Sequence, residues 1–164
     1  FAPSHATPML YTSLKLIHLL SIIVWLGGMA FAHFFLRPAV QQLEPPVRLQ
    51  LMNDVLQRFF AAVTVIVVLV LLSGLGMVGL VHSMAARAGT AFTMPLSWMV
   101  MSVLGVVMIA VFGHICFALF KRLQRAVAAK DWPAGGKAMG QIRQWVAFNL
   151  ALGTVIVLAL HLPI

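Results

Sequence analysis

Four long, uninterrupted apolar stretches constrain this chain more than any other feature of its sequence. An α-helix rises 1.5 Å per residue, so about 20 apolar residues cross the roughly 30 Å of hydrocarbon in a bilayer. The stretches that approach or exceed this length are residues 10–36, 59–81, 96–120 and 145–162. With 62% hydrophobic and only 9% charged residues, the chain is predicted to be an integral membrane protein.

The connections between these stretches carry the turn residues that a membrane span avoids. They are Pro38, Pro45 and Pro46, then Gly89 and Pro95, then Asp131, Pro133, Gly135 and Gly136. Connections this short favour antiparallel neighbours, so we expect an all-α, up-and-down four-helix bundle that forms a single domain over residues 10–164. Residues 1–9 are expected to be an N-terminal segment that is either processed or an expression-derived remnant, and they are given no function.

The basic residues predict how the bundle is oriented. Nine of the eleven Lys and Arg flank or occupy the first and third connections. The positive-inside rule makes that side cytoplasmic, which places both termini in the periplasm of a bacterium. We therefore expect a multi-pass protein of the bacterial inner (plasma) membrane. The net charge of +8 then reflects topology and affinity for anionic lipid, and nothing indicates a nucleic-acid site.

Histidines are concentrated in the apolar stretches, where an ionisable group is costly and therefore a functional candidate. Five of the six histidines lie in or beside these stretches: His18, His33, His82, His114 and His161. Counted from the cytoplasmic ends at about 1.5 Å per residue, His18 and His161 share one depth in the outer half of the bilayer. His33 and His114 share another near the cytoplasmic face. His82 falls at the outer interface.

Two imidazoles on opposing helices, beside an apolar slot, are what a non-covalent b-type haem requires. Pairing His18 with His161 and His33 with His114 predicts two haems that carry electrons across the membrane, with a lipid quinone as the natural partner. Further candidate contacts are Trp25 and Met29 on the inward stripe of the first stretch, Lys15 for the outer propionates, and Arg37, Arg58 and Lys121 for the inner ones.

Two other interpretations of the histidines stay open. Polar side chains also hydrogen-bond one membrane helix to another without any cofactor, and glycines are common where such helices cross. A different functional class is copper handling, in which His18, Met29 and His161 relay the metal, because nitrogen and thioether ligands suit Cu(I). The single cysteine, Cys116, excludes an intrachain disulfide and a CxxCH attachment for c-type haem.

Three segments carry a resemblance to known proteins: LKLIHLLSIIVWLGGMAFAHFFLRPAV, FGHICFALFKRL and IRQWVAFNLALG. Through them most of residues 10–160 resembles the bacterial copper-resistance D (CopD) family. A more distant similarity to the HemJ-type protoporphyrinogen oxidases rests on His18, Trp25, Gly27, His114, Arg143 and Asn149. This similarity implies b-haem ligation by His18 and, in second place, by His114. It also adds haem-dependent protoporphyrinogen oxidation as a third function, whereas the likeness to two-haem b-type cytochromes is one of architecture only.

Overall fold

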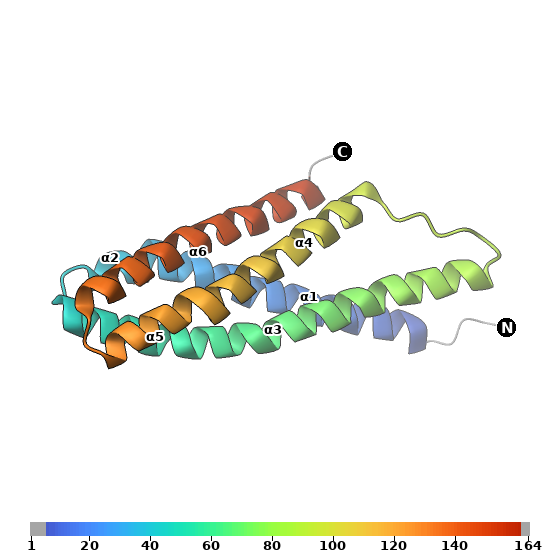
Figure 1. Ribbon diagram of the computed structural model, residues 1–164. Helices are drawn as coiled ribbons and strands as arrows, with labels where there is room; N and C mark the ends of the chain where they lie inside the picture. The colour runs from blue at the N-terminus through green and yellow to red at the C-terminus, as the bar shows by residue number, and fades with distance from the viewer. Residues whose placement is uncertain (1–5, 162–164) are drawn as a thin grey trace.

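The computed structural model describes residues 6–161, and within that range the chain forms four long helical rods and no strand (Figure 1). Two of the rods contain a single π-helical turn, labelled η. In chain order the elements are α1 (Ala6–Phe31), η1 (Ala32–Leu36) and α2 (Arg37–Val40); α3 (Pro45–Arg87); α4 (Leu96–His114), η2 (Ile115–Leu119) and α5 (Phe120–Ala128); and α6 (Trp132–His161). All four rods are long and apolar enough to cross a membrane, which confirms the predicted four-helix membrane bundle.

The rods extend beyond the predicted apolar stretches at the end that carries most of the basic residues. Helix α3 begins at Pro45 rather than at residue 59, and α6 begins at Trp132 rather than at residue 145. At 43 residues, α3 alone is about 65 Å long, roughly twice the hydrocarbon thickness. Residues 1–5 of the expected N-terminal segment, and residue 162 of the fourth apolar stretch, lie outside the described residues.

The third connection is shorter than the sequence predicted. Pro133 lies in the first turn of α6, where a missing N–H costs nothing. The carboxylate of Asp131 accepts a hydrogen bond from the backbone N–H of Ala134 at 3.2 Å, and so caps this helix. Gly135, expected in the loop, is instead buried in α6 against Leu49 of α3. The two helices are so close here that a side-chain carbon at Gly135 would lie 3.0 Å from Cδ1 of Leu49. Its predicted place in the loop was wrong.

The rods associate as two pairs, α1 along α3 and α4 along α6. Edge-to-face aromatic contacts fill the centre of the bundle: Phe60 lies 5.8 Å from Phe112 and 5.2 Å from Phe120, and Trp25 lies 6.2 Å from Phe112. Each such pair contributes about 0.5–1.5 kcal/mol beyond its buried area. These contacts hold the first three rods together at mid-length.

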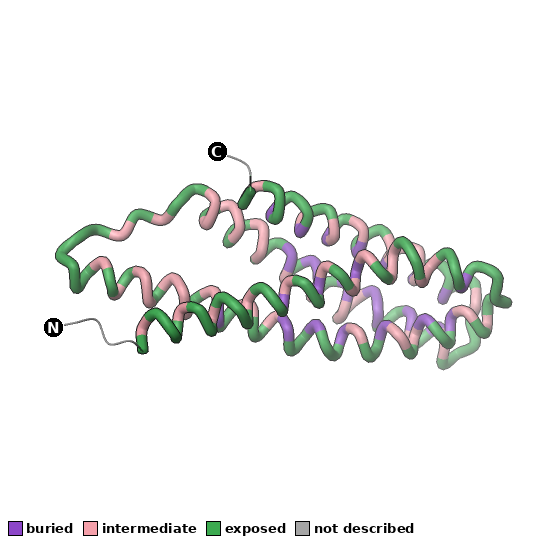
Figure 2. Tube along the Cα trace, turned by 180° about the vertical axis from the view of Figure 1, so that it is seen from behind, coloured by how far each residue is buried: buried purple, intermediate pink, exposed green. Residues whose placement is uncertain are grey.

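Burial is uneven along the bundle (Figure 2). Among the described residues, none is buried in α3 beyond Ser73, in α4 before Met108 or in α6 beyond Ile156. In the same region the α1 and α3 ribbons diverge from α4 (Figure 1). The tightly packed half therefore lies toward α2 and α5, and the other end of the bundle is splayed.

Candidate functional site: a histidine held between the first two rods

The imidazole of His18 lies against α3 near the last buried residue of that helix. Its Nδ1 atom is 3.0 Å from Oγ of Ser73 and 3.2 Å from the carbonyl oxygen of Val70. A carbonyl can only accept, so Nδ1 carries the proton. The Ser73 hydroxyl donates to carbonyls of its own helix, those of Leu69 and Val70, and keeps a lone pair for the imidazole.

The other ring nitrogen, Nε2 of His18, is buried and has no hydrogen-bond partner among the described residues. Leaving a buried polar atom unpaired costs about 1–3 kcal/mol, so such an atom calls for an explanation. A neutral imidazole that donates through one nitrogen to a carbonyl and presents the other as a bare lone pair is the usual arrangement of a metal-ligating histidine. Nε2 could therefore hold a haem iron or a copper ion.

Small residues on α3 allow this close approach. Ser73 is 2% exposed, and Gly74 follows it directly. A side-chain carbon at Gly74 would lie 3.4 Å from Cε1 of His18, and one at Gly76 would lie 3.0 Å from Leu14. Helix α1 therefore packs closely against a short segment of α3 that has few side-chain atoms.

The predicted partner, His161, lies level with His18, and its imidazole is bonded to its own helix. Helices α1 and α6 run antiparallel and meet where Leu26 packs on Gly153. His18 lies eight residues before Leu26, and His161 lies eight residues after Gly153. Because the helices are antiparallel, both counts run in the same direction along the bundle, and the two histidines are at one level. The side chain of His161 is exposed, and its Nδ1 donates to the carbonyl of Val157 in its own helix at 2.8 Å.

The second predicted pair also shares a level without contact. His33 lies in the π turn η1, is half-buried, and lines a small cavity together with Val146. His114, the last residue of α4, is exposed and lies edge-on to the neighbouring Trp145, with ring centroids 5.1 Å apart. Within residues 6–161, no hydrogen bond or ring contact joins the two histidines of either predicted pair, and both pairings stay predictions. His82 is exposed beside Phe92.

The remaining predicted contacts divide into buried and exposed groups. Trp25 is 4% and Met29 2% exposed, so both belong to the core face of α1. Arg37 is half-buried and lines two neighbouring cavities. Lys15, Arg58 and Lys121 are exposed. Within residues 6–161, no group of three or more His, Cys, Asp or Glu side chains is placed to hold a metal ion.

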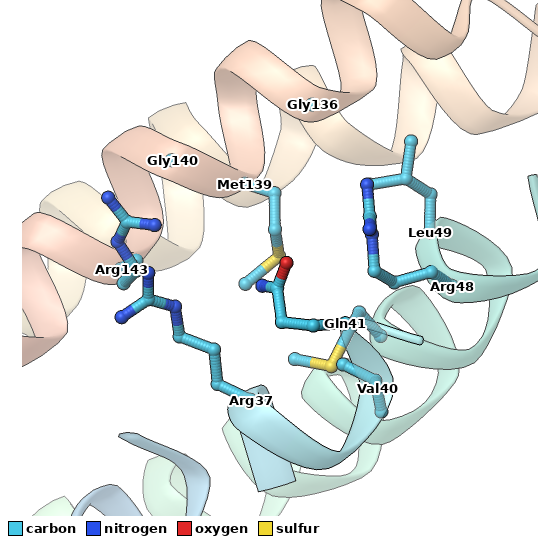
Figure 3. Close-up of a pocket in the computed structure, with 10 residues that line it drawn as sticks. Arg37, Val40, Gln41, Arg48, Leu49, Gly136, Met139, Gly140 and Arg143 are labelled. Atoms are coloured by element: carbon cyan, nitrogen blue, oxygen red, sulfur yellow. The ribbon is translucent and has the colours of Figure 1, made fainter. Parts of the chain in front are cut away.

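A second site, which the sequence did not indicate, lies at the basic end of the bundle (Figure 3). It is a pocket of about 210 Å³ between α2, α3 and α6. The polar side chains that line it are those of Arg37, Gln41, Arg48 and Arg143. Gln41 and Arg48 lie between the first two apolar stretches of the sequence, and the extension of α3 back to Pro45 is what brings Arg48 to this pocket.

Four membrane-length helices around a buried aromatic core, with a fixed histidine on the first, define a multi-pass α-helical membrane protein. More specifically, the chain belongs to the copper resistance protein D (CopD) family, whose sequence profile matches residues 53–162. The matched region starts within α3 and continues through α6, so His18 and His33 lie outside it. Comparison with curated proteins and with solved structures gave no match.

Proposed function

We propose that this protein is a membrane redox protein that binds haem b through Nε2 of His18. The observation that supports this proposal is the buried, unpartnered Nε2 beside an Nδ1–H fixed by Val70 and Ser73. A porphyrin supplies four of the iron ligands itself, so one preset imidazole is enough to anchor it. A haem held there would supply a one-electron Fe(II)/Fe(III) couple, with a membrane quinone as the proposed exchange partner.

The residues around His18 have distinct roles in this proposal. Val70 and Ser73 orient the ring and raise the basicity of Nε2 by accepting the Nδ1 proton in a hydrogen bond. Lys15 is exposed one turn away on α1 and would supply a cation for a propionate. Across the splayed end of the bundle, His161 is level with His18 and would be available as a second ligand once its ring turned away from the Val157 carbonyl.

The absorbance spectrum and the iron content per chain test whether haem binds and how many haems are present. Protein purified in detergent should show a Soret band and one iron per chain, and both should be lost in the His18→Ala variant. His82→Ala, which removes an exposed histidine, is the matched control and should leave the spectrum unchanged. Two irons per chain, with one lost in His33→Ala, would support the pairing of His33 with His114. A chain that takes up no haem after incubation with hemin would exclude the proposal.

Copper handling is the second candidate, and a specific observation favours it. One small cavity is lined by His33, Met52 and Met139, and an imidazole with two thioethers is a suitable donor set for Cu(I). The family description points in the same direction. Arg37 and Arg143 line the same cavity and oppose a cation there, which ranks this function second. Metal analysis that finds copper without iron, with the copper lost in Met52→Leu, would reverse the order.

A further inference from the structure

Three arginines from three helices converge on the pocket at the basic end. Figure 3 shows the side chains of Arg37 and Arg143 lying next to each other, with Arg48 on the opposite side of Gln41 and Met139. All three arginines are half-buried. Their guanidinium groups thus lie around one space of about 210 Å³ rather than spreading into solvent.

This concentration of positive charge has no acidic counterpart. The whole chain contains three acidic residues, Glu44, Asp54 and Asp131, and none of them lines the pocket. Like charges gathered in a partly buried space repel one another, and an anion placed between them removes the repulsion. Guanidinium forks bind phosphate through paired, charge-assisted hydrogen bonds. The pocket is therefore suited to a phosphate group.

An apolar cavity continues from the arginines toward the centre of the bundle. It shares Arg37, Met52, Met139 and Arg143 with the first pocket and is otherwise lined mainly by apolar side chains. Those deeper apolar residues are Leu56, Phe59, Ile142 and Val146. The combined site is cationic at one end and apolar at the other, which matches a molecule with an anionic head and a hydrocarbon body.

The position of the site identifies the class of that molecule. Arg37 follows the first apolar stretch, residues 10–36, and Arg143 precedes the fourth, residues 145–162. The arginines therefore lie at the level of the lipid head groups, and basic pockets between membrane helices on this side bind anionic head groups. We propose that Arg37, Arg48 and Arg143 bind the phosphate of an anionic phospholipid, whose acyl chain lies toward Leu56 and Phe59. This site does not include His18, but its apolar part is the cavity considered above for copper, so a lipid chain and a copper ion would exclude each other there.

Native mass spectrometry of the full chain in detergent tests the proposal. The probes are phosphatidylglycerol, cardiolipin, phosphatidylcholine and inorganic phosphate. We expect the wild-type chain to prefer the anionic lipids over phosphatidylcholine by at least about tenfold. Arg37→Gln and Arg143→Gln should each weaken anionic lipid binding on the order of tenfold, the loss typical of one hydrogen bond to a charged group. Arg122→Gln, an exposed arginine of α5 at the same end, should lose no more than about twofold.

Three results would overturn the lipid assignment. Equal binding of phosphatidylcholine would show that the arginines do not select the head group. Equal losses in Arg122→Gln and Arg143→Gln would indicate a diffuse surface charge rather than a pocket. Displacement of bound lipid by millimolar inorganic phosphate would assign the pocket to a free anion. The comparison of lipids on the wild-type chain tests the proposal even if a variant fails to fold. The haem content of each sample shows separately whether the His18 site is intact.

Discussion

Nδ1 of His18 lies 3.0 Å from Oγ of Ser73, and this contact joins the first two rods where burial along α3 ends. Ser73 is itself anchored to the carbonyls of Leu69 and Val70 in its own helix. The imidazole is therefore held by a hydroxyl and a carbonyl that belong to one rigid helical turn. Its other ring nitrogen, Nε2, has no hydrogen-bond partner within residues 6–161.

Ser73→Ala should weaken cofactor binding without unfolding the bundle. The Val70 carbonyl still accepts from Nδ1, so the stability loss should be about 1 kcal/mol. Loss of the hydroxyl lets the ring rotate, and haem affinity should fall on the order of tenfold. Hemin titration followed at the Soret band measures this. Ser102→Ala is the control, because Ser102 is exposed and donates only to Trp98 of its own helix. Equal affinities in the two variants would contradict the orienting role of Ser73.

The crossing of α1 and α6 should be sensitive to a single methyl group at Gly153. A side-chain carbon there would lie 2.9–3.1 Å from three atoms of Leu26. Gly153→Ala should therefore destabilise the protein by about 1–3 kcal/mol, and adding Leu26→Ala should recover much of that loss. Gly105→Ala, with no atom within 4 Å of the new carbon, is the control. Thermal unfolding in detergent compares the wild-type chain, the two single variants, the double variant and the Gly105→Ala control. If the destabilisations caused by Gly153→Ala and Leu26→Ala simply add in the double variant, the packing of Leu26 on Gly153 is refuted.

The aromatic centre should behave as a coupled unit. Phe60 and Phe112 meet edge to face at 5.8 Å, so a double-mutant cycle of Phe60→Leu and Phe112→Leu should give a coupling free energy of about 1 kcal/mol. Phe117 is 79% exposed, and Phe117→Leu should change stability by less than about 0.5 kcal/mol. Unfolding in mixed detergent and denaturant provides the free energies. A coupling indistinguishable from zero would mean that the ring geometry contributes nothing.

The proposed orientation can be tested by cysteine labelling in a Cys116→Ala background. Gln42 lies in the connection after α2, and Thr93 lies in the connection after α3; both are exposed. The positive-inside rule predicts that a membrane-impermeant maleimide labels Thr93→Cys in intact bacterial cells. It should label Gln42→Cys only after the cells are opened. The reverse pattern would invert the topology and place the arginine pocket on the outer side.

The rods and their number could be predicted from the sequence because apolar length is a local property. The same holds for the inward face of α1, where Trp25 and Met29 are buried as the helical period requires. The helix ends could not be predicted from hydropathy. Beyond the predicted apolar stretches, α3 and α6 are extended where Leu49 packs on Gly135. From the sequence alone, a proline in the first turn of a helix cannot be distinguished from a proline in a loop.

The environment of His18 could be predicted only in part. Its inward direction follows from the helical period. Its contact with Ser73 depends on the axial position of α1 relative to α3, which no local sequence pattern determines. The two π turns add a further difference from the ideal helix assumed for the sequence. One of them contains His33 and the other follows His114 directly. The rotation per residue departs from that of an ideal helix in both turns, so an equal depth along the axis does not make two side chains point toward each other.

Helix α3 is continuous from Pro45 to Arg87, and it carries both Arg48 and Ser73. These residues stand about 38 Å apart along one axis at 1.5 Å per residue. One uninterrupted helix therefore contributes a residue to each of the two proposed sites. We expect a substitution that changes the tilt of α3 to alter lipid binding at Arg48 and cofactor binding at His18 together, although the two sites share no residue.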